Sequence, residues 1–193
     1  MAANLRVMKD GLQVATTSND ETKIIMKNKT VVTAEKGVQE LFITREFEAP
    51  RELVFRAFNE PELLAKWLGP RNTTTRIDYL DSRSGGSYRF LTCEESGNKH
   101  YFNGVIHEVT APERIIRTSE YEGIPERGHV SLETATFEPL NGGRTKLIIQ
   151  AVFKSVADRD AMIAAGMERG VNEGNERLDI LLEKLSAEVE QPA

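Results

Sequence analysis

The residues best suited to chemistry in this sequence are carboxylates inside alternating polar and apolar segments: Glu108, Glu120 and Glu133. A carboxylate that faces an apolar interior is desolvated, which raises its pKa and suits it to general acid–base catalysis. In segment 114–122, Ile116 and Glu120 share one face, while Arg117 on the other is expected to face water. The alternation predicts that Ile116 and Glu120 point inward; a single β-bulge would reverse this and leave Glu120 in solvent.

Aromatic residues on the expected helices and strands form a second group that could surround a small molecule. They are Phe55, Phe58, Trp67, Tyr88, Phe90, Phe102, Phe137 and Phe153. Aromatic side chains usually build core. Their joint placement nevertheless favours an apolar pocket, in which a few polar groups would orient the ligand.

Near the C-terminus, Met167 and Val171 lie on an apolar stripe at helical spacing, with Gly170 and Gly174 one turn apart on or beside it. A glycine inside a helix costs about 1 kcal/mol relative to alanine, so the two glycines need a reason. Two reasons stay open. The helix could approach a sheet closely there, or the glycines could leave room for a ligand.

Motifs for metal, redox and nucleotide chemistry are missing from the sequence. The three histidines fall in separate segments without chelating spacing, and Cys93 is a single cysteine with no cationic neighbourhood. Gly85-Gly86 lies between expected strands rather than before a helix, so it indicates a turn and not a phosphate loop. We predict no metal and no cofactor, and we assign no catalytic residue.

Composition limits the partners further. The 193 residues include 25 basic and 30 acidic ones, a net charge of −5, and this disfavours nucleic acid because phosphate binding needs a surplus of Lys and Arg. No apolar run reaches the roughly eighteen residues of a membrane span. A single cysteine, and an N-terminal segment without the apolar centre of a signal peptide, favour the cytoplasm.

The elements that would position these residues follow from periodicity. Alternation predicts a strand over 39–47, and helical spacing after Pro50 and after Pro61 predicts two short helices. Six strands joined by Gly, Asn and Pro turns are then expected over 74–81, 87–94, 99–109, 114–122, 130–138 and 146–153. A capping box at Ser155 starts a helical region that ends near Leu185 and is divided at Gly166 and Gly170.

This order, β-α-α-β6-α, predicts an α+β fold in which an antiparallel sheet curls around a long C-terminal helix, a helix-grip architecture. We expect the domain to span 39–187. It would follow an N-terminal extension, 1–38, that is partly flexible around the polar stretch 16–22, and precede a tail, 188–193.

Five segments in a fixed order support the same fold: ITREFEAPRELVFRAFNEPELLAKWLGP, SGGSYRF, FNGVIHEVTAPERII, GGRTKL and DRDAMIAAGMERGVNEGNERLDILLEKL. With them the chain resembles the SRPBCC/START-like superfamily over about residues 30–186, and within it the bacterial homologues of the activator of heat-shock protein 90 ATPase. The resemblance implies a seven-stranded antiparallel sheet gripping the C-terminal helix, with a hydrophobic cavity between them. Relatives in the wider superfamily bind lipids, sterols, polyketides or plant hormones there, and some are enzymes.

The first functional expectation is therefore a protein that binds a small hydrophobic or amphipathic ligand between sheet and helix. The expected lining residues are Phe55, Phe58, Trp67, Tyr88, Phe90, Phe102, Ile116, Glu120, Phe153, Met167, Val171 and Gly174. One alternative is a regulator of heat-shock protein 90, against which the single expected domain counts because the eukaryotic activator has two. Another is a cyclase or hydrolase-type enzyme that uses a pocket carboxylate. A homodimer is compatible with the sequence.

Overall fold

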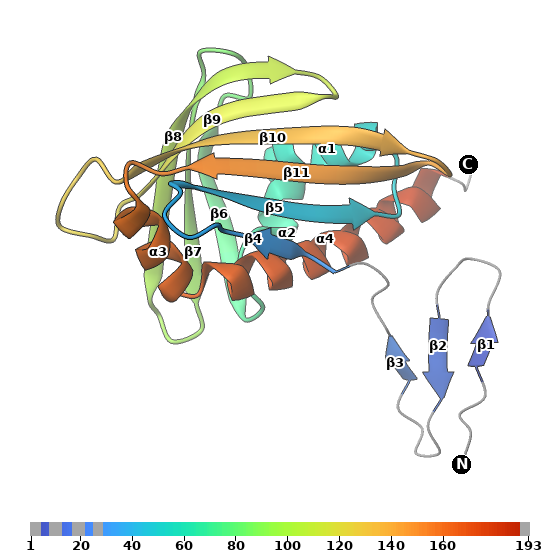
Figure 1. Cartoon of the computed structure of the whole chain (residues 1–193). Coiled ribbons are helices and arrows are strands. Elements are labelled where there is room, and N and C mark those ends of the chain that lie inside the picture. The colour runs from blue at the N-terminus through green and yellow to red at the C-terminus, as the bar shows by residue number, and fades with distance from the viewer. Residues whose placement is uncertain (1–4, 8–12, 17–21, 25–28, 190–193) are drawn as a thin grey trace.

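The computed structural model describes residues 5–7, 13–16, 22–24 and 29–189 (Figure 1). Three short strands at the N-terminus pair antiparallel in a sheet of their own: β1 (Leu5–Val7), β2 (Gln13–Thr16) and β3 (Thr22–Ile24). The stretch 16–22 that we expected to be flexible falls mostly outside the described residues.

Eight antiparallel strands form the main sheet, in the order β4-β5-β11-β10-β9-β8-β7-β6 (Figure 1). They are β4 (Val31–Thr33), β5 (Glu40–Phe47), β6 (Thr73–Leu80), β7 (Ser87–Glu94), β8 (Lys99–Thr110), β9 (Arg114–Tyr121), β10 (Val130–Leu140) and β11 (Arg144–Val152). The helices are α1 (Arg51–Asn59), α2 (Pro61–Trp67), α3 (Val156–Ala164) and α4 (Met167–Val189).

The expected helix-grip fold is confirmed, with two differences. The sheet has eight strands rather than seven, because β4 pairs with β5 at the sheet edge. The C-terminal helical region divides only at Gly166, whose φ of +88° suits glycine at a helix end, while Gly170 lies inside α4. The domain boundary between residues 38 and 39 stays a prediction. The strand β4, which lies before that boundary in the sequence, nevertheless belongs to the main sheet.

One face of the main sheet, here called the inner face, carries the core. Burial along β5 alternates strictly, so that Leu41, Ile43, Arg45 and Phe47 are buried and their neighbours are partly exposed. Helices α1 and α2 and the C-terminal half of α4 cover one end of this face. A smaller apolar cluster joins β5 and β11 to α3 and the start of α4.

A buried arginine on β5, next to the sheet edge, binds α4 to this face. Arg45 is 2% exposed, forms an ion pair with Asp179 on α4, and donates to the Thr30 hydroxyl at 3.1 Å. Asn175 on α4 donates to the same hydroxyl at 3.0 Å. Desolvation raises the pKa of Asp179 to about 6, although Arg45 acts in the opposite direction. Thr30, just before β4, is therefore a structural part of the main domain.

On its other side α4 packs against the loop between α2 and β6. Arg177 donates to the backbone carbonyls of Lys66, Gly69 and Pro70 at 2.9–3.1 Å. A Cβ on Gly174 would lie 3.5 Å from the carbonyl oxygens of Trp67 and Gly69. A Cβ at this distance would be in ordinary van der Waals contact, so the packing does not demand a glycine, and the backbone that Gly174 faces is at the end of α2 and in this loop rather than in a sheet.

The role of Thr30 predicts how far the N-terminus can be shortened. A chain starting at Met26 keeps Thr30 and β4 and should unfold within a few degrees of the full chain, since among the described residues β1–β3 share no strand pairing with the main sheet. A chain starting at Gln39 loses the Thr30 hydroxyl that accepts from Arg45 and Asn175, at a cost of about 1–3 kcal/mol for each lost hydrogen bond. Thermal unfolding followed by circular dichroism measures the stability of both shortened chains, and the Thr30→Val variant of the full chain isolates the contribution of the hydroxyl. Equal stability of all three chains would contradict this role.

The pKa of Asp179 predicts a pH-dependent difference between the wild type and Asp179→Asn. A raised folded-state pKa stabilises the protein below the unfolded value of 3.8, and this contribution is lost as pH rises through about 6. Between about pH 7.5 and pH 5, the wild type should gain roughly 1 kcal/mol relative to Asp179→Asn. Urea unfolding at both pH values measures the difference, and a constant difference would show that the pKa is not raised.

Candidate functional site

Beyond the core, the inner face of β7–β9 carries a ladder of aromatic rings. Phe90 and Phe102 are cross-strand partners, and so are Phe102 and Tyr121, so all three rings share the face of the buried Tyr88. Successive ring centroids lie 6.0 Å apart from Tyr88 to Phe90, 5.1 Å from Phe90 to Phe102 and 5.2 Å from Phe102 to Tyr121. The first two pairs are stacked and the third is tilted, as expected of adjacent rings on a pleated surface.

These rings are not all covered. Tyr88 is 3% exposed, whereas Phe90, Phe102 and Tyr121 are each partly exposed. Phe102 and Tyr121 belong to neither apolar cluster of the described residues. Aromatic side chains that face the interior but keep accessible surface border space that another molecule could fill. We call Phe90, Phe102 and Tyr121 the aromatic platform.

A charged pair lies beside the platform on the same face. Arg117 on β9 and Glu133 on β10 are cross-strand partners, and the Arg117 Nε donates to the Glu133 carboxylate at 3.0 Å. The Arg117 guanidinium lies 5.0 Å from the ring centroid of Tyr88, a cation–π contact. Burial raises the pKa of Tyr88, whose hydroxyl donates to the Thr118 carbonyl at 2.9 Å. The contact with the Tyr88 ring therefore helps to orient the Arg117 guanidinium.

A second polar group stands at the other end of the platform. The His100 Nδ1 lies 3.0 Å from the Tyr121 hydroxyl, and its Nε2 lies 2.9 Å from Glu94. Hydrogen bonds from Asn98, Ser96 and His100 lower the pKa of Glu94 to about 2, so this carboxylate is ionised at neutral pH. Together the platform, the Arg117–Glu133 pair and the Glu94–His100 pair form the candidate site.

Of the twelve predicted lining residues, Tyr88, Phe90 and Phe102 belong to this site or support it. Phe55, Phe58 and Trp67 lie instead in the packed core under α1 and α2, none more than 8% exposed. The Phe58 and Trp67 rings are 4.7 Å apart, and the Trp67 Nε1 donates to the Ala57 carbonyl at 2.9 Å. Their aromatic character serves core packing.

The predicted inward orientation of Ile116 and Glu120 is wrong. Arg117 pairs with the buried Ile106, and Ile115 is itself in the core, so the odd-numbered residues of β9 face inward. Ile116 and Glu120 therefore lie on the outer face. There Glu120 accepts hydrogen bonds from Arg127 and from the Gly128 backbone, both at 2.9 Å. A register shift between Ile106 and Glu108 on β8 also places Glu108 on the outer face, beside Ile116.

The remaining predicted residues come from the C-terminal region. Phe153, Met167 and Val171 are partly buried and pack in the smaller cluster with Leu41 and Ile43 of β5. Their place as ligand contacts stays a prediction. Gly174 faces the backbone of the α2–β6 loop, which occupies the room that we had considered for a ligand.

The sequence reasoning missed the inward orientation of Arg117 and did not single out Tyr121 or the Glu94–His100 pair as site residues. Glu133 was considered as a strand carboxylate and does face inward. Arg117 could have been found from the pairing of β9 with β10, which places it opposite Glu133. The expected order of hairpins implied that β9 pairs with β10, but it did not give the register of that pairing.

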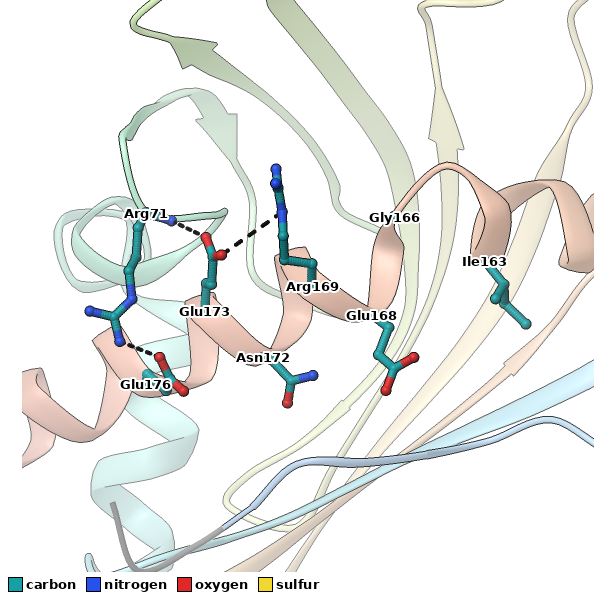
Figure 2. Close-up of a pocket in the computed structure, with 8 residues that line it drawn as sticks. All are labelled: Arg71, Ile163, Gly166, Glu168, Arg169, Asn172, Glu173 and Glu176. Atoms are coloured by element: carbon teal, nitrogen blue, oxygen red, sulfur yellow. Dashed lines mark hydrogen bonds and ion pairs between the residues drawn. The ribbon is translucent and has the colours of Figure 1, made fainter. Parts of the chain in front are cut away.

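A separate hollow lies on the outer side of α4 (Figure 2). Its lining includes the charged residues Arg71, Arg169, Glu173 and Glu176. In Figure 2, Arg71 extends over α4, where its backbone N–H donates to Glu173 at 2.8 Å and its guanidinium pairs with Glu176. Because these charges pair with one another on an open surface, we consider the inner face the better candidate.

Within the described ranges, no set of three or more His, Cys, Asp or Glu side chains is arranged to hold a metal ion. In the same ranges, no helix has the length and apolar character needed to cross a membrane.

The curled antiparallel sheet and the long C-terminal helix packed against its inner face define a helix-grip, START-like protein. Residues 48–183 match the model of the family described as Activator of Hsp90 ATPase homolog 1-like protein, and the chain belongs to this family.

Solved structures agree with this assignment. A crystal structure of a Chromobacterium violaceum protein is 31% identical, with a TM-score of 0.64, over 75% of this chain and 97% of that one. A solution structure from Arthrobacter aurescens is 23% identical, with a TM-score of 0.73, over 80% and 91% of the two chains. The AHSA1 protein from Silicibacter pomeroyi is 21% identical, with a TM-score of 0.61, over 77% and 99%. No curated protein matches the chain.

Proposed function

We propose that this protein binds a small amphipathic molecule whose apolar body lies against the aromatic platform. The observation that carries the proposal is that Phe102 and Tyr121 face the interior, remain partly exposed and join neither core cluster. Burying such rings against an apolar ligand is favourable because it removes their surface from water. Family membership supports the proposal, since START-like relatives bind ligands between sheet and helix.

Charged groups near the platform would fix the orientation of the ligand. Ligand sites are typically apolar with a few placed polar groups, and Arg117 and Glu133 fit that description. Of the strand carboxylates Glu108, Glu120 and Glu133, only Glu133 faces inward. A cyclase or hydrolase-type enzyme that uses a pocket carboxylate would therefore have to use Glu133. The hydrogen bond from the Arg117 Nε holds the Glu133 carboxylate in place on the inner face, which favours a role in positioning a ligand.

Binding of the neutral apolar dye Nile red tests the proposal. Phe102→Ala should weaken dye affinity about five- to tenfold, the equivalent of roughly 1 kcal/mol for one aromatic contact. Phe42→Ala is the matched control, because Phe42 is a partly buried phenylalanine of β5 on the outer face. Fluorescence titration measures both affinities. Equal affinity in the two folded variants, or no dye binding by the wild type, would refute the proposal.

The family description itself provides a second candidate, regulation of a heat-shock protein 90 ATPase. The ligand-binding proposal predicts an unchanged ATPase rate when micromolar amounts of the protein are added to the chaperone from the same organism. The net charge of −5 also gives no basic excess to steer the protein onto an acidic partner. A coupled ATPase assay is the measurement. A saturable, severalfold rise in rate would favour the regulator instead.

A further inference from the structure

The Arg117–Glu133 pair has hydrogen-bonding capacity left over. The pair uses one of the five N–H groups of the guanidinium and one carboxylate oxygen. Among the described residues, neither the terminal nitrogens of Arg117 nor the second oxygen of Glu133 makes another hydrogen bond. The side chains are 28% and 22% exposed, so both keep accessible surface on the inner face, next to the Tyr88 ring that stacks with Phe90 of the platform. The site therefore presents a donor and an acceptor side by side.

The position of the pair is fixed before any ligand arrives. Tyr88 is buried under the guanidinium, and its own hydroxyl is held by the Thr118 carbonyl. The cross-strand register sets Arg117 directly opposite Glu133. Preorganised groups lose little entropy on binding, which makes such a pair effective at discriminating between head groups.

The charges of the site argue against a charged head group. Arg117 and Glu133 cancel one another, and Glu94 at the far end of the platform adds a negative charge. An anionic ligand would meet two carboxylates and a cation that is already neutralised. A cationic head group at the pair would meet the Arg117 guanidinium at close range, whereas the excess negative charge, that of Glu94, lies at the far end of the platform. In a partly buried site each of these contacts is unfavourable because screening by water is weak.

We propose that the ligand is uncharged and combines a flat apolar body with a head group that both accepts and donates a hydrogen bond, such as a carboxamide. Its acceptor would bind Arg117, its donor would bind Glu133, and its body would cover Phe90 and Phe102. This inference rests on the ligand-binding function proposed above and names the chemical class that the site would select.

Displacement of Nile red by a matched naphthalene series tests the inference. Naphthamide carries donor and acceptor, methyl naphthoate lacks the donor, and naphthoate carries a negative charge on the same ring system. We expect naphthamide to displace the dye at a concentration about tenfold lower than either relative, because each of those leaves one polar group of the pair unsatisfied or adds repulsion. Equal potency of the three compounds, or preference for naphthoate, would overturn the inference.

Two variants connect the selectivity to the pair. Glu133→Gln keeps the shape but removes one negative charge, so the preference should shift toward naphthoate by severalfold. Arg117→Met should abolish the advantage of naphthamide over methyl naphthoate. If Arg117→Met does not fold, the conservative Glu133→Gln variant still decides. Glu120→Gln, on the outer face of the same strand as Arg117, is the control and should keep the wild-type order. An unchanged order in Glu133→Gln would contradict the inference.

The proposed function and the head-group inference can be refuted separately. Absence of Nile red binding by the wild-type protein refutes the proposed function and the head-group inference together. Dye binding that weakens in Phe102→Ala but shows no preference for naphthamide supports the proposed function and refutes the inference alone.

Discussion

The ion pair between Arg45 and Asp179 is the interaction on which the rest of the structure depends. It joins β5, next to the edge strand β4, to α4, and the Thr30 hydroxyl accepts hydrogen bonds from both Arg45 and Asn175 of α4. Breaking one side of such a buried pair typically costs about 3–5 kcal/mol, because the remaining charge stays desolvated. Together with Arg177 and the loop after α2, it fixes where α4 crosses the inner face.

The placement of α4 determines which part of the inner face stays open. The C-terminal half of the helix completes the large core with α1 and α2, and its beginning packs with α3 on β5 and β11. Phe102 and Tyr121, on β8 and β9, lie in neither cluster. The inner face therefore stays partly open at Phe102 and Tyr121, because α4 packs on two separate apolar clusters and neither cluster includes these rings.

Periodicity predicted the fold well because sheet and helix patterns are local. All seven expected strands and the helices are present, whereas β4 has only three residues, too few for an alternating signal. The site was harder to predict. Ile115 and Ile116 are adjacent on β9, so both faces of that strand look apolar, and the orientation was decided by assuming that Arg117 faces water. Its inward position depends on Glu133 across the strand pair, which is information from outside the segment.

The ion pairs Arg45–Asp179 and Arg117–Glu133 both lie on the inner face, but they have different roles. Arg45 is 2% exposed, and its two terminal nitrogens donate to Asp179 and Thr30 inside the fold, so a ligand has no access to that pair. Arg117 shares its face of the sheet but is 28% exposed, and it makes one hydrogen bond to a described side chain. Both pairs carry the desolvation cost of a charge inside the fold. In the Arg45 pair, Asp179 and Thr30 bind the two terminal nitrogens inside the fold, and the buried Nε has no partner among the described residues. The Arg117 pair instead keeps unused terminal N–H groups and a carboxylate oxygen at accessible surface, beside partly exposed aromatic rings. This difference is what a site prepared for a polar head group requires, and it is why we assign binding to Arg117 and support to Arg45.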